Sequence, residues 1–509
     1  MEILGLVDVP LYLLLVVVAA VLIYLYGTSN YDYFKKLGIP GPTSYPFIGC
    51  SIGFTFYSKF YSWKQQYGSV FGIFMGKTPA LVISDLDILK EVLVKSFNTF
   101  RNRMKITIIP YPFNLAVFFL DGAHWKRVRS IISPSFSSAK LRLMGAAIND
   151  CAMTLSKNFS KVVGKNEAVN MKKYFSAYTI DVISRTAFGI KIDSQNDFDN
   201  PFVANAKEIF QHTNMRRVLP IIAGVMPRLA RALRKRGFGM YPQRVMSFFQ
   251  RNVTEMIKQR QNKKREKQKQ RIDFLQLLVD AEIEADSDDI AHAAKGQISE
   301  SDAVRRLSTD EIVGQSIVFF SAGYEATAST LTFASYSLAV NPDVQEKAYN
   351  EITEMLGNEE PNYDNIQKLK YLDNILTETL RLYPPVITLH RRASETIQIK
   401  GLTIPKGQTV FIPVFALQRD PQLFKDPESF KPERHDEKSN PLSFLAFGYG
   451  PRKCIGMRLA LVKAKIALVH VLRTVKFERT PDTPEVLTFK ETNFLRSEKD
   501  ITLKLSSRC

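Results

Sequence analysis

The chain has 509 residues, of which 45% are hydrophobic, and this is enough apolar material for a sizeable core. No Gly/Ser-rich or Pro-rich linker divides it after residue 45, and no internal repeat is evident, so we expect one large globular unit. Four irregularly spaced cysteines argue against a disulfide framework, and a net charge of +19 without stacking aromatics in the basic runs argues against nucleic-acid binding.

The N-terminal segment predicts a membrane anchor. Residues 10–26 carry no charge and would form a helix ~25 Å long, which the apolar residues 3–7 extend to a full span. No Lys or Arg precedes Lys35, which argues against a cleaved signal peptide. Lys35 and Lys36 then place the main body in the cytoplasm by the positive-inside rule. We expect a transmembrane signal anchor over 1–27, a basic, Pro-rich hinge over 28–45 and a globular domain over 46–509.

The rest of the chain predicts a mainly α fold with small peripheral sheets. Ser84 is the expected cap of one helix, and Ser308 with Glu311 forms a capping box for a helix ~48 Å long that ends before Pro342. The expected helices cover residues 85–96, 123–132, 308–340, 371–383 and 455–475. A hairpin is expected from strands 70–75 and 80–83 around 76–79, and further strands at 396–399, 402–404 and 409–414.

Two basic runs stand out. Residues 216–236 contain seven basic side chains and an apolar face, which favours a surface that dips into an anionic membrane. That face consists of Ile221, Ile222, Val225, Met226, Leu229 and Leu233. Residues 258–271 contain eight basic residues and one acid, and this run is equally consistent with a solvated face.

The segment 447–456 is the most informative part of the sequence. It places Cys454 in a glycine-rich loop just before an apolar, helix-like run, where the free amides of the helix favour a thiolate. Gly450 and Gly456 leave room for a flat ligand, and Arg452 adds positive charge. A lone cysteine beside a helix is usually an inert buried residue, but the full pattern favours a thiolate that ligates a haem iron.

This segment matches the pattern Phe-x-x-Gly-x-Arg-x-Cys-x-Gly, and the chain therefore resembles the cytochrome P-450 family of haem-thiolate monooxygenases. Four segments earlier in the chain also match the family, in the order that the family has them: Trp125 with Arg129, residues 322–325, Glu378 with Arg381, and residues 430–434 with Arg434. The residues at 322–325, Ala-Gly-Tyr-Glu, are most similar to those of the microsomal drug- and steroid-oxidising branch. The resemblance implies the cytochrome P-450 fold with a long central helix, and haem b as the cofactor.

The resemblance also implies roles for individual residues. Cys454 would ligate the iron, Phe447 would shield its sulfur, and the haem propionates would be bound by Trp125, Arg103, Arg129, Arg391 and Arg452. Glu378, Arg381 and Arg434 would form a buried network that supports the cofactor site. Glu325 and Thr327 would act in oxygen activation, although Ala326 stands where the family usually has the threonine that feeds protons. Thr327 could substitute through a local bulge, an ordered water could substitute, or oxygen activation could be less coupled.

The predicted function is insertion of one oxygen atom from O2 into lipophilic substrates, namely xenobiotics, steroids or fatty acids. A loop-like stretch with Phe97, Phe100, Phe113, Phe118 and Phe119 is expected to roof an apolar pocket for them. The chain has no dinucleotide or flavin fingerprint, so electrons from NADPH would come through a separate diflavin reductase, with cytochrome b5 as a further candidate partner. The expected location is the endoplasmic reticulum membrane, single-pass, with the catalytic domain in the cytoplasm.

Two alternatives stay open from the sequence. The first is a reductase-independent haem-thiolate isomerase or dehydratase of lipid peroxides, which Ala326 mildly favours. The second is a non-catalytic, membrane-anchored haem- or lipid-binding protein. The physiological substrate, the regioselectivity, the oligomeric state and the organismal role do not follow from the sequence.

Overall fold

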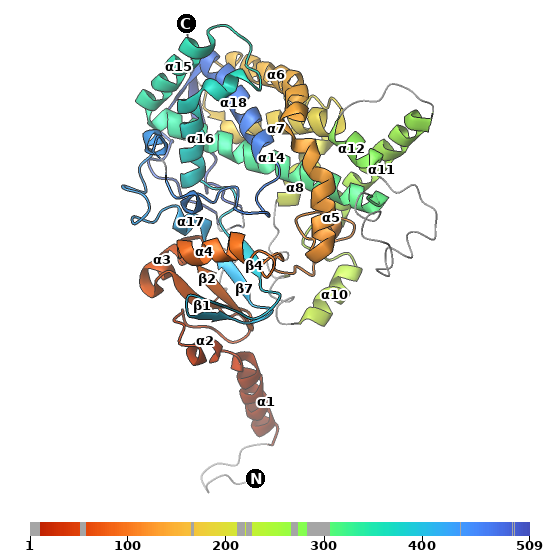
Figure 1. The fold of residues 1–509 in the computed structure, drawn as a ribbon, viewed down its shortest axis with the longest axis vertical. Coiled ribbons are helices and arrows are strands. Elements are labelled where there is room, and N and C mark those ends of the chain that lie inside the picture. The colour runs from red at the N-terminus through yellow and green to blue at the C-terminus, as the bar shows by residue number, and fades with distance from the viewer. Residues whose placement is uncertain are drawn as a thin grey trace.

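The structure is a computed structural model that describes residues 11–50, 57–163, 167–210, 219, 226–265, 273–281, 306–437, 439–490, 492 and 494–508. The predicted fold class is confirmed, because the chain is mainly helical with small sheets (Figure 1). The α-helices are α1 (Leu11–Thr28), α2 (Tyr33–Lys36), α3 (Tyr57–Tyr67), α4 (Leu86–Lys90), α5 (Gly122–Ile132), α6 (Ser138–Ser160), α7 (Met171–Phe188), α8 (Pro201–Phe210), α10 (Pro227–Lys235), α11 (Gln243–Arg265), α12 (Phe274–Asp280), α14 (Thr309–Val340), α15 (Pro342–Leu356), α16 (Lys370–Leu382), α17 (Val414–Leu417) and α18 (Met457–Thr474).

Within the described ranges, the strands form three small sheets. They are β1 (Val70–Met75), β2 (Thr78–Ile83), β3 (Val169–Asn170), β4 (Leu389–Arg392), β5 (Ile397–Ile399), β6 (Leu402–Ile404), β7 (Thr409–Ile412), β8 (Val475–Glu478) and β9 (Thr502–Ser507). The largest sheet has the order β1-β2-β7-β4, in which only the β2–β7 pair is parallel. The hairpin prediction is confirmed, but Met75 pairs with Thr78, so the turn is two residues shorter than expected. Strand β7 ends at Ile412, because Pro413 leads into the short helix α17.

The central helix α14 begins as predicted. The Ser308 hydroxyl accepts a hydrogen bond from the Glu311 amide at 3.2 Å, and the Glu311 carboxylate accepts one from the Ser308 amide at 2.9 Å. The helix ends at Asn341 before Pro342, and nearly all of its second half is buried. It runs through the helical part of the molecule and packs against α7, α11, α16 and α18 (Figure 1). This placement brings its residues near several distant segments of the chain.

One predicted helix cap is wrong. Asp85, and not Ser84, caps α4, because its carboxylate accepts from the amides of Asp87 at 3.0 Å and Ile88 at 2.9 Å. The Ser84 hydroxyl instead donates to the Ser69 carbonyl at 3.2 Å. The helix expected over 85–96 is α-helical to Lys90 and continues as a π-helix over Glu91–Lys95. The ends of the other expected helices shift by two residues or fewer.

The N-terminal helix α1 is mostly exposed and is, among the described residues, the one helix long and apolar enough to cross a membrane. It projects from the end of the molecule that carries the largest sheet (Figure 1). The segment that follows packs on this sheet: Phe34 of α2 is 4% exposed, and its ring lies 5.3 Å from that of Phe74. A Cβ on Gly72 would lie 2.3 Å from the Phe34 ring, so this close contact depends on glycine.

The helix α10 lies in the same half of the molecule as the sheet (Figure 1). Met226 just before it and Leu229 within it are exposed, whereas Leu233 packs against a small core around Ile108. The predicted apolar positions Ile221, Ile222 and Val225 lie outside the described residues, as does the 266–271 part of the second basic run.

Candidate functional site

Cys454 lies in a tight loop that its glycines make possible. Gly448 and Gly450 have φ values of 70° and 73°, in the left-handed region. A Cβ on Gly450 would lie 2.0 Å from the Leu93 carbonyl oxygen, so the loop backbone passes directly against that segment. The Cys454 amide donates to the Phe447 carbonyl at 2.8 Å, and α18 begins three residues later at Met457. The loop therefore fixes the direction of the Cys454 side chain.

Cys454 has accessible surface, although the surrounding protein buries it enough to affect its thiol. The residue has accessible surface, yet burial raises the pKa of its thiol. These two observations agree if the sulfur faces a space inside the protein. A hydrogen bond from the Gly456 backbone and the positive charges of Arg129 and Arg103 act in the opposite direction and favour the thiolate. The site can thus stabilise a thiolate that binds a metal ion.

Arg452 is buried beside this loop. Its guanidinium donates to the carbonyl oxygens of Leu120 at 2.6 Å and Arg101 at 2.9 Å, and its Cζ lies 4.3 Å from the centre of the Trp125 ring. Burial, followed by the charges of neighbouring arginines, lowers the pKa of Arg452 to about 8. Trp125 and Arg452 therefore lie in direct contact.

Arg391 of β4 is 1% exposed, and one of its polar atoms has no partner. Its Nη1 donates to the His390 carbonyl at 2.9 Å, whereas its Nε has no hydrogen-bond acceptor within the described residues. Burial and the charge of Arg103 lower the pKa of Arg391 to about 9. Burial and three nearby arginines lower the pKa of His390 to about 3, so this histidine is neutral.

Two further arginines complete the predicted set. Arg103 donates to the Phe118 carbonyl at 3.3 Å and lies 4.1 Å from the centre of the Phe118 ring. Arg129 donates to the Lys453 carbonyl at 3.0 Å, next to the cysteine. Burial lowers the pKa of both guanidinium groups, that of Arg103 to about 10. Arg103, Arg391 and Arg129 each lower the pKa of Arg452, so the four arginines lie close together.

The charges of this cluster fit a haem. Asp121 raises the pKa of Arg103 and Arg452, and the Cys454 thiolate raises that of Arg103 and Arg129, so four arginines face one carboxylate and one thiolate within the described residues. Two propionates would supply the missing negative charge, and the orphaned Arg391 Nε would gain an acceptor. No group of three or more His, Cys, Asp or Glu side chains that could hold a metal occurs among the described residues. A metal at Cys454 would have to bring most of its own ligands, as haem iron does.

Glu378 lies at the centre of a buried ion-pair network, as the sequence predicts. Its carboxylate accepts from Arg381 at 2.8 and 2.9 Å, from Arg434 at 2.9 Å and from the Lys431 amide at 3.0 Å. His435 lies 2.8 Å away as a fourth partner that sequence reasoning missed. Burial alone would raise the pKa of Glu378, but the hydrogen bonds from Arg381 and His435 outweigh it and lower the pKa to about 2.

Glu325 on the central helix is 2% exposed and is ion-paired on two sides. Its carboxylate lies 3.1 Å from Lys172 and 3.0 Å from Arg496, and Lys172 also donates to the Ser329 hydroxyl at 2.8 Å. Burial would raise the pKa of Glu325, but the two cations outweigh it and keep the carboxylate charged. Sequence reasoning missed these partners, because they are more than 150 residues away along the chain.

The region around Ala326 is a regular helix. α14 is α-helical from Thr309 to Val340, so Thr327 does not replace the missing threonine through a local bulge. Thr327 is 2% exposed. One turn earlier, the Gly323 carbonyl accepts a hydrogen bond from Lys463 of α18, a buried lysine that sequence reasoning missed. Burial lowers the pKa of Lys463 to about 7, and the nearby Cys454 acts in the opposite direction.

The predicted phenylalanine cluster is only partly brought together. The Phe113 and Phe119 rings lie 5.3 Å apart, and those of Phe118 and Phe119 lie 5.0 Å apart. Phe97 packs against Trp125, with ring centres 5.6 Å apart. Phe100 instead belongs to the core beside the largest sheet, so its assignment to the pocket roof is wrong. Phe100 lies there because the chain turns back toward β4 directly after it.

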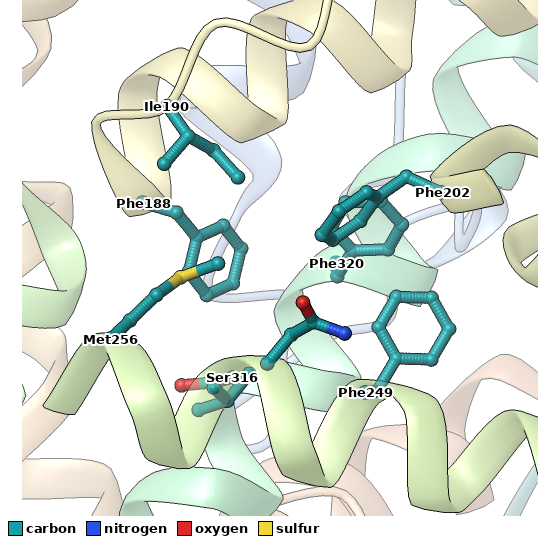
Figure 2. Close-up of a pocket in the computed structure, with 9 residues that line it drawn as sticks. Phe188, Ile190, Phe202, Phe249, Met256, Ser316 and Phe320 are labelled. Atoms are coloured by element: carbon teal, nitrogen blue, oxygen red, sulfur yellow. The ribbon is translucent and has the colours of Figure 1, made fainter. Parts of the chain in front are cut away.

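A small cavity lies between α8, α11 and α14 (Figure 2). Its walls are mostly apolar and include the aromatic rings of Phe202, Phe249 and Phe320. Ser316 also lines it, is fully buried, and its hydroxyl has no hydrogen-bond partner within the described residues. None of the cavity's lining residues belongs to the Cys454 loop or the arginine cluster.

Comparison with known proteins agrees with this site. The family model for cytochrome P-450 matches residues 39–505. The chain is 38% identical over 503 residues to cytochrome P-450 3A13 of Mus musculus, and 39% identical over 506 residues to cytochrome P-450 3A7 of Homo sapiens. Each alignment covers 97% of this chain and 96% of the relative. The chain therefore belongs to the cytochrome P-450 family, and it is a monooxygenase of the oxidoreductase class with haem as its cofactor.

Proposed function

We propose that the protein inserts one oxygen atom from O2 into lipophilic substrates, namely xenobiotics, steroids or fatty acids. Electrons would come from NADPH through a separate diflavin reductase, with cytochrome b5 as a further donor. The observation that carries the proposal is the exposed residue Cys454 beside a cluster of arginines, of which Arg391 and Arg452 are buried. The basic chain, with a net charge of +19, suits an acidic reductase surface.

We assign cofactor binding to the residues around the loop. Cys454 is the metal ligand, the Gly456 amide tempers its charge, and Phe447 covers the sulfur. The propionates are bound by Trp125, Arg103, Arg129, Arg391 and Arg452. When bound, a haem with a thiolate ligand supplies the chemistry that cleaves the O–O bond of oxygen.

We assign proton handling to Glu325, and to Thr327 acting through an ordered water and not in place of the missing hydroxyl. Lys172 and Arg496 are partly exposed, with side chains 29% and 25% accessible, so they link buried Glu325 to solvent. Ala326 offers no hydroxyl, and the helix is regular there, so an ordered water must carry the proton or coupling must fall. We expect Ala326→Thr to lower the peroxide released per substrate oxidised. An unchanged ratio would contradict this assignment.

We also propose the membrane arrangement. Residues 1–27 would anchor the chain in the endoplasmic reticulum membrane, residues 28–45 would connect it, and residues 46–509 would form the catalytic domain in the cytoplasm. The mean hydropathy of 2.4 over α1 supports the anchor, and exposed Met226 and Leu229 with the arginines of α10 support a second contact with the bilayer.

Two measurements test the proposed function. The reduced, carbon-monoxide-treated protein should have the absorption of a thiolate complex, and Cys454→His should lose it. Oxidation of a lipophilic probe such as testosterone should then require NADPH and reductase. Turnover of a lipid hydroperoxide without reductase, and none of testosterone with it, would instead support the isomerase or dehydratase that Ala326 favours.

A further inference from the structure

Lys463 is a buried cation at the crossing of α18 and α14. Its side chain is among the largest that are fully buried, and its residue is 1% exposed. Its Nζ donates to the carbonyl oxygen of Gly323 on the central helix. Its own carbonyl accepts from the Tyr178 hydroxyl at 2.7 Å, which holds the backbone of this turn in place. The lysine therefore joins the helix that follows Cys454 to the helix that carries Glu325.

A buried ammonium of this kind is costly for folding. Among the described residues, no carboxylate lies within ion-pair distance of the Lys463 Nζ. Lys465, two residues further on, is equally buried but pairs with Asp373 at 2.6 Å and donates to the Ile366 carbonyl at 3.0 Å. Since an unpaired buried charge lowers stability, Lys463 is not explained by folding alone.

The position of Lys463 points to Cys454. The lysine lies six residues into α18, ~9 Å along the helix axis from its first residue, and Cys454 lies just before that residue. The two side chains interact electrostatically, since each favours the charged form of the other. A positive charge here stabilises negative charge on the sulfur, as hydrogen bonds around ligating sulfurs do.

We propose that Lys463 is a positioning residue for this site, which sets the electron affinity of the metal bound to Cys454 and holds Gly323 of the central helix. This inference rests on the proposed haem-thiolate function. The reduced site carries one more negative charge than the oxidised site, so a nearby ammonium favours reduction. By contrast, the ion pair of Lys465 with Asp373 offsets the charge of Lys465.

The test is a potentiometric titration of the purified full-length haem protein at pH 6, where Lys463 is mostly protonated; a reducing dye donates one electron to the ferric site and no bond is broken. Lys463→Met removes the charge, and we expect the equilibrium constant for reduction to fall about tenfold, a shift of about 59 mV to more negative potential. Thermal stability should be equal or higher, because the desolvated charge is gone. Lys465→Met is the matched control and should leave the potential unchanged.

Three results would overturn the inference: an unchanged potential in Lys463→Met, an equal shift in Lys465→Met, or loss of stability without a redox shift. If Lys463→Met does not retain haem, Lys463→Gln keeps a donor for Gly323 without the charge and should show the same shift. Loss of haem from both variants would assign a structural role instead. A wild-type protein without the thiolate absorption would refute the proposed function itself, which is a separate outcome.

Discussion

Replacement of Glu378 by Ala should be among the most damaging single changes in the chain. Glu378 and Arg381 are both 0% exposed, and the carboxylate accepts hydrogen bonds from Arg381, Arg434 and the Lys431 amide. The change leaves a fully buried guanidinium without its counter-ion. Removing one partner of a buried pair costs about 3–5 kcal/mol.

This cost is large compared with the whole stability of a folded domain, about 5–15 kcal/mol. Arg381 keeps three acceptors, the carbonyls of Gln418, Pro427 and Ser429, so hydrogen bonding is only partly lost. The charge itself stays uncompensated, because none of these groups is ionised. We therefore expect a loss of about 3 kcal/mol or more and release of haem, since this network holds the segment before the Cys454 loop.

The assay is urea unfolding of the detergent-solubilised protein, followed together with haem absorbance. Glu433→Ala is the control, because its ion pair with Lys347 at 2.9 Å is about half exposed and such pairs contribute about 0–1 kcal/mol. If Glu378→Ala retained full haem and unfolded within about 0.5 kcal/mol of Glu433→Ala, the view of the network as a buried, charge-balanced unit would be wrong.

Three further outcomes are expected. The pKa of Glu378 is lowered from 4.5 to about 2, so its ionised form contributes about 3 kcal/mol to stability above pH 4.5, and this contribution is lost as the pH falls toward 2. In acid unfolding followed by circular dichroism, Glu378→Gln should therefore lack the loss of stability between pH 4.5 and 2. Gly450→Ala should abolish haem binding, since its Cβ would meet a carbonyl oxygen at 2.0 Å. Gly407→Ala has the same backbone strain at φ 84° but no contact within 4 Å, and it should retain haem; equal haem content in the two variants would contradict the steric argument. Ser316→Ala removes an unpartnered buried hydroxyl and should raise stability by about 1 kcal/mol in thermal unfolding, whereas Ser335→Ala removes one that donates at 2.9 Å and should not. A stability loss in Ser316→Ala would mean that the hydroxyl has a partner, such as a bound water.

The parts of the site that depend on neighbours in sequence could be predicted. The loop before α18, the capping box of Ser308 and Glu311, and the pair Glu378–Arg381 each lie within one short segment, so spacing alone carries the signal. Burial then determines how much each of these interactions contributes to stability, and the spacing of residues in the sequence does not show burial. In the sequence alone, a Glu-x-x-Arg pair looks the same as an exposed ion pair on a helix. Only the three-dimensional structure shows that it is buried.

Contacts between distant segments could not be predicted. Lys172 and Arg496 reach Glu325 only because α7 and the C-terminal segment pack against the same face of α14. In the sequence, Lys463 is a polar residue within an otherwise apolar helix. Its hydrogen bond to the Gly323 carbonyl depends on how α18 crosses α14. The change from α-helix to π-helix after Lys90 follows from tertiary packing and not from a pattern of residues in the sequence.

The packing of Phe34 against Gly72 bears on how this enzyme sits on its membrane. The Tyr33 hydroxyl next to it donates to the Gln408 side chain at 3.1 Å, so the chain is fastened to the sheet a few residues after α1. The globular body is therefore joined to α1 by a short, packed segment and not by a flexible linker. If α1 anchors the protein as proposed, this packing would set the tilt of the globular body relative to the bilayer.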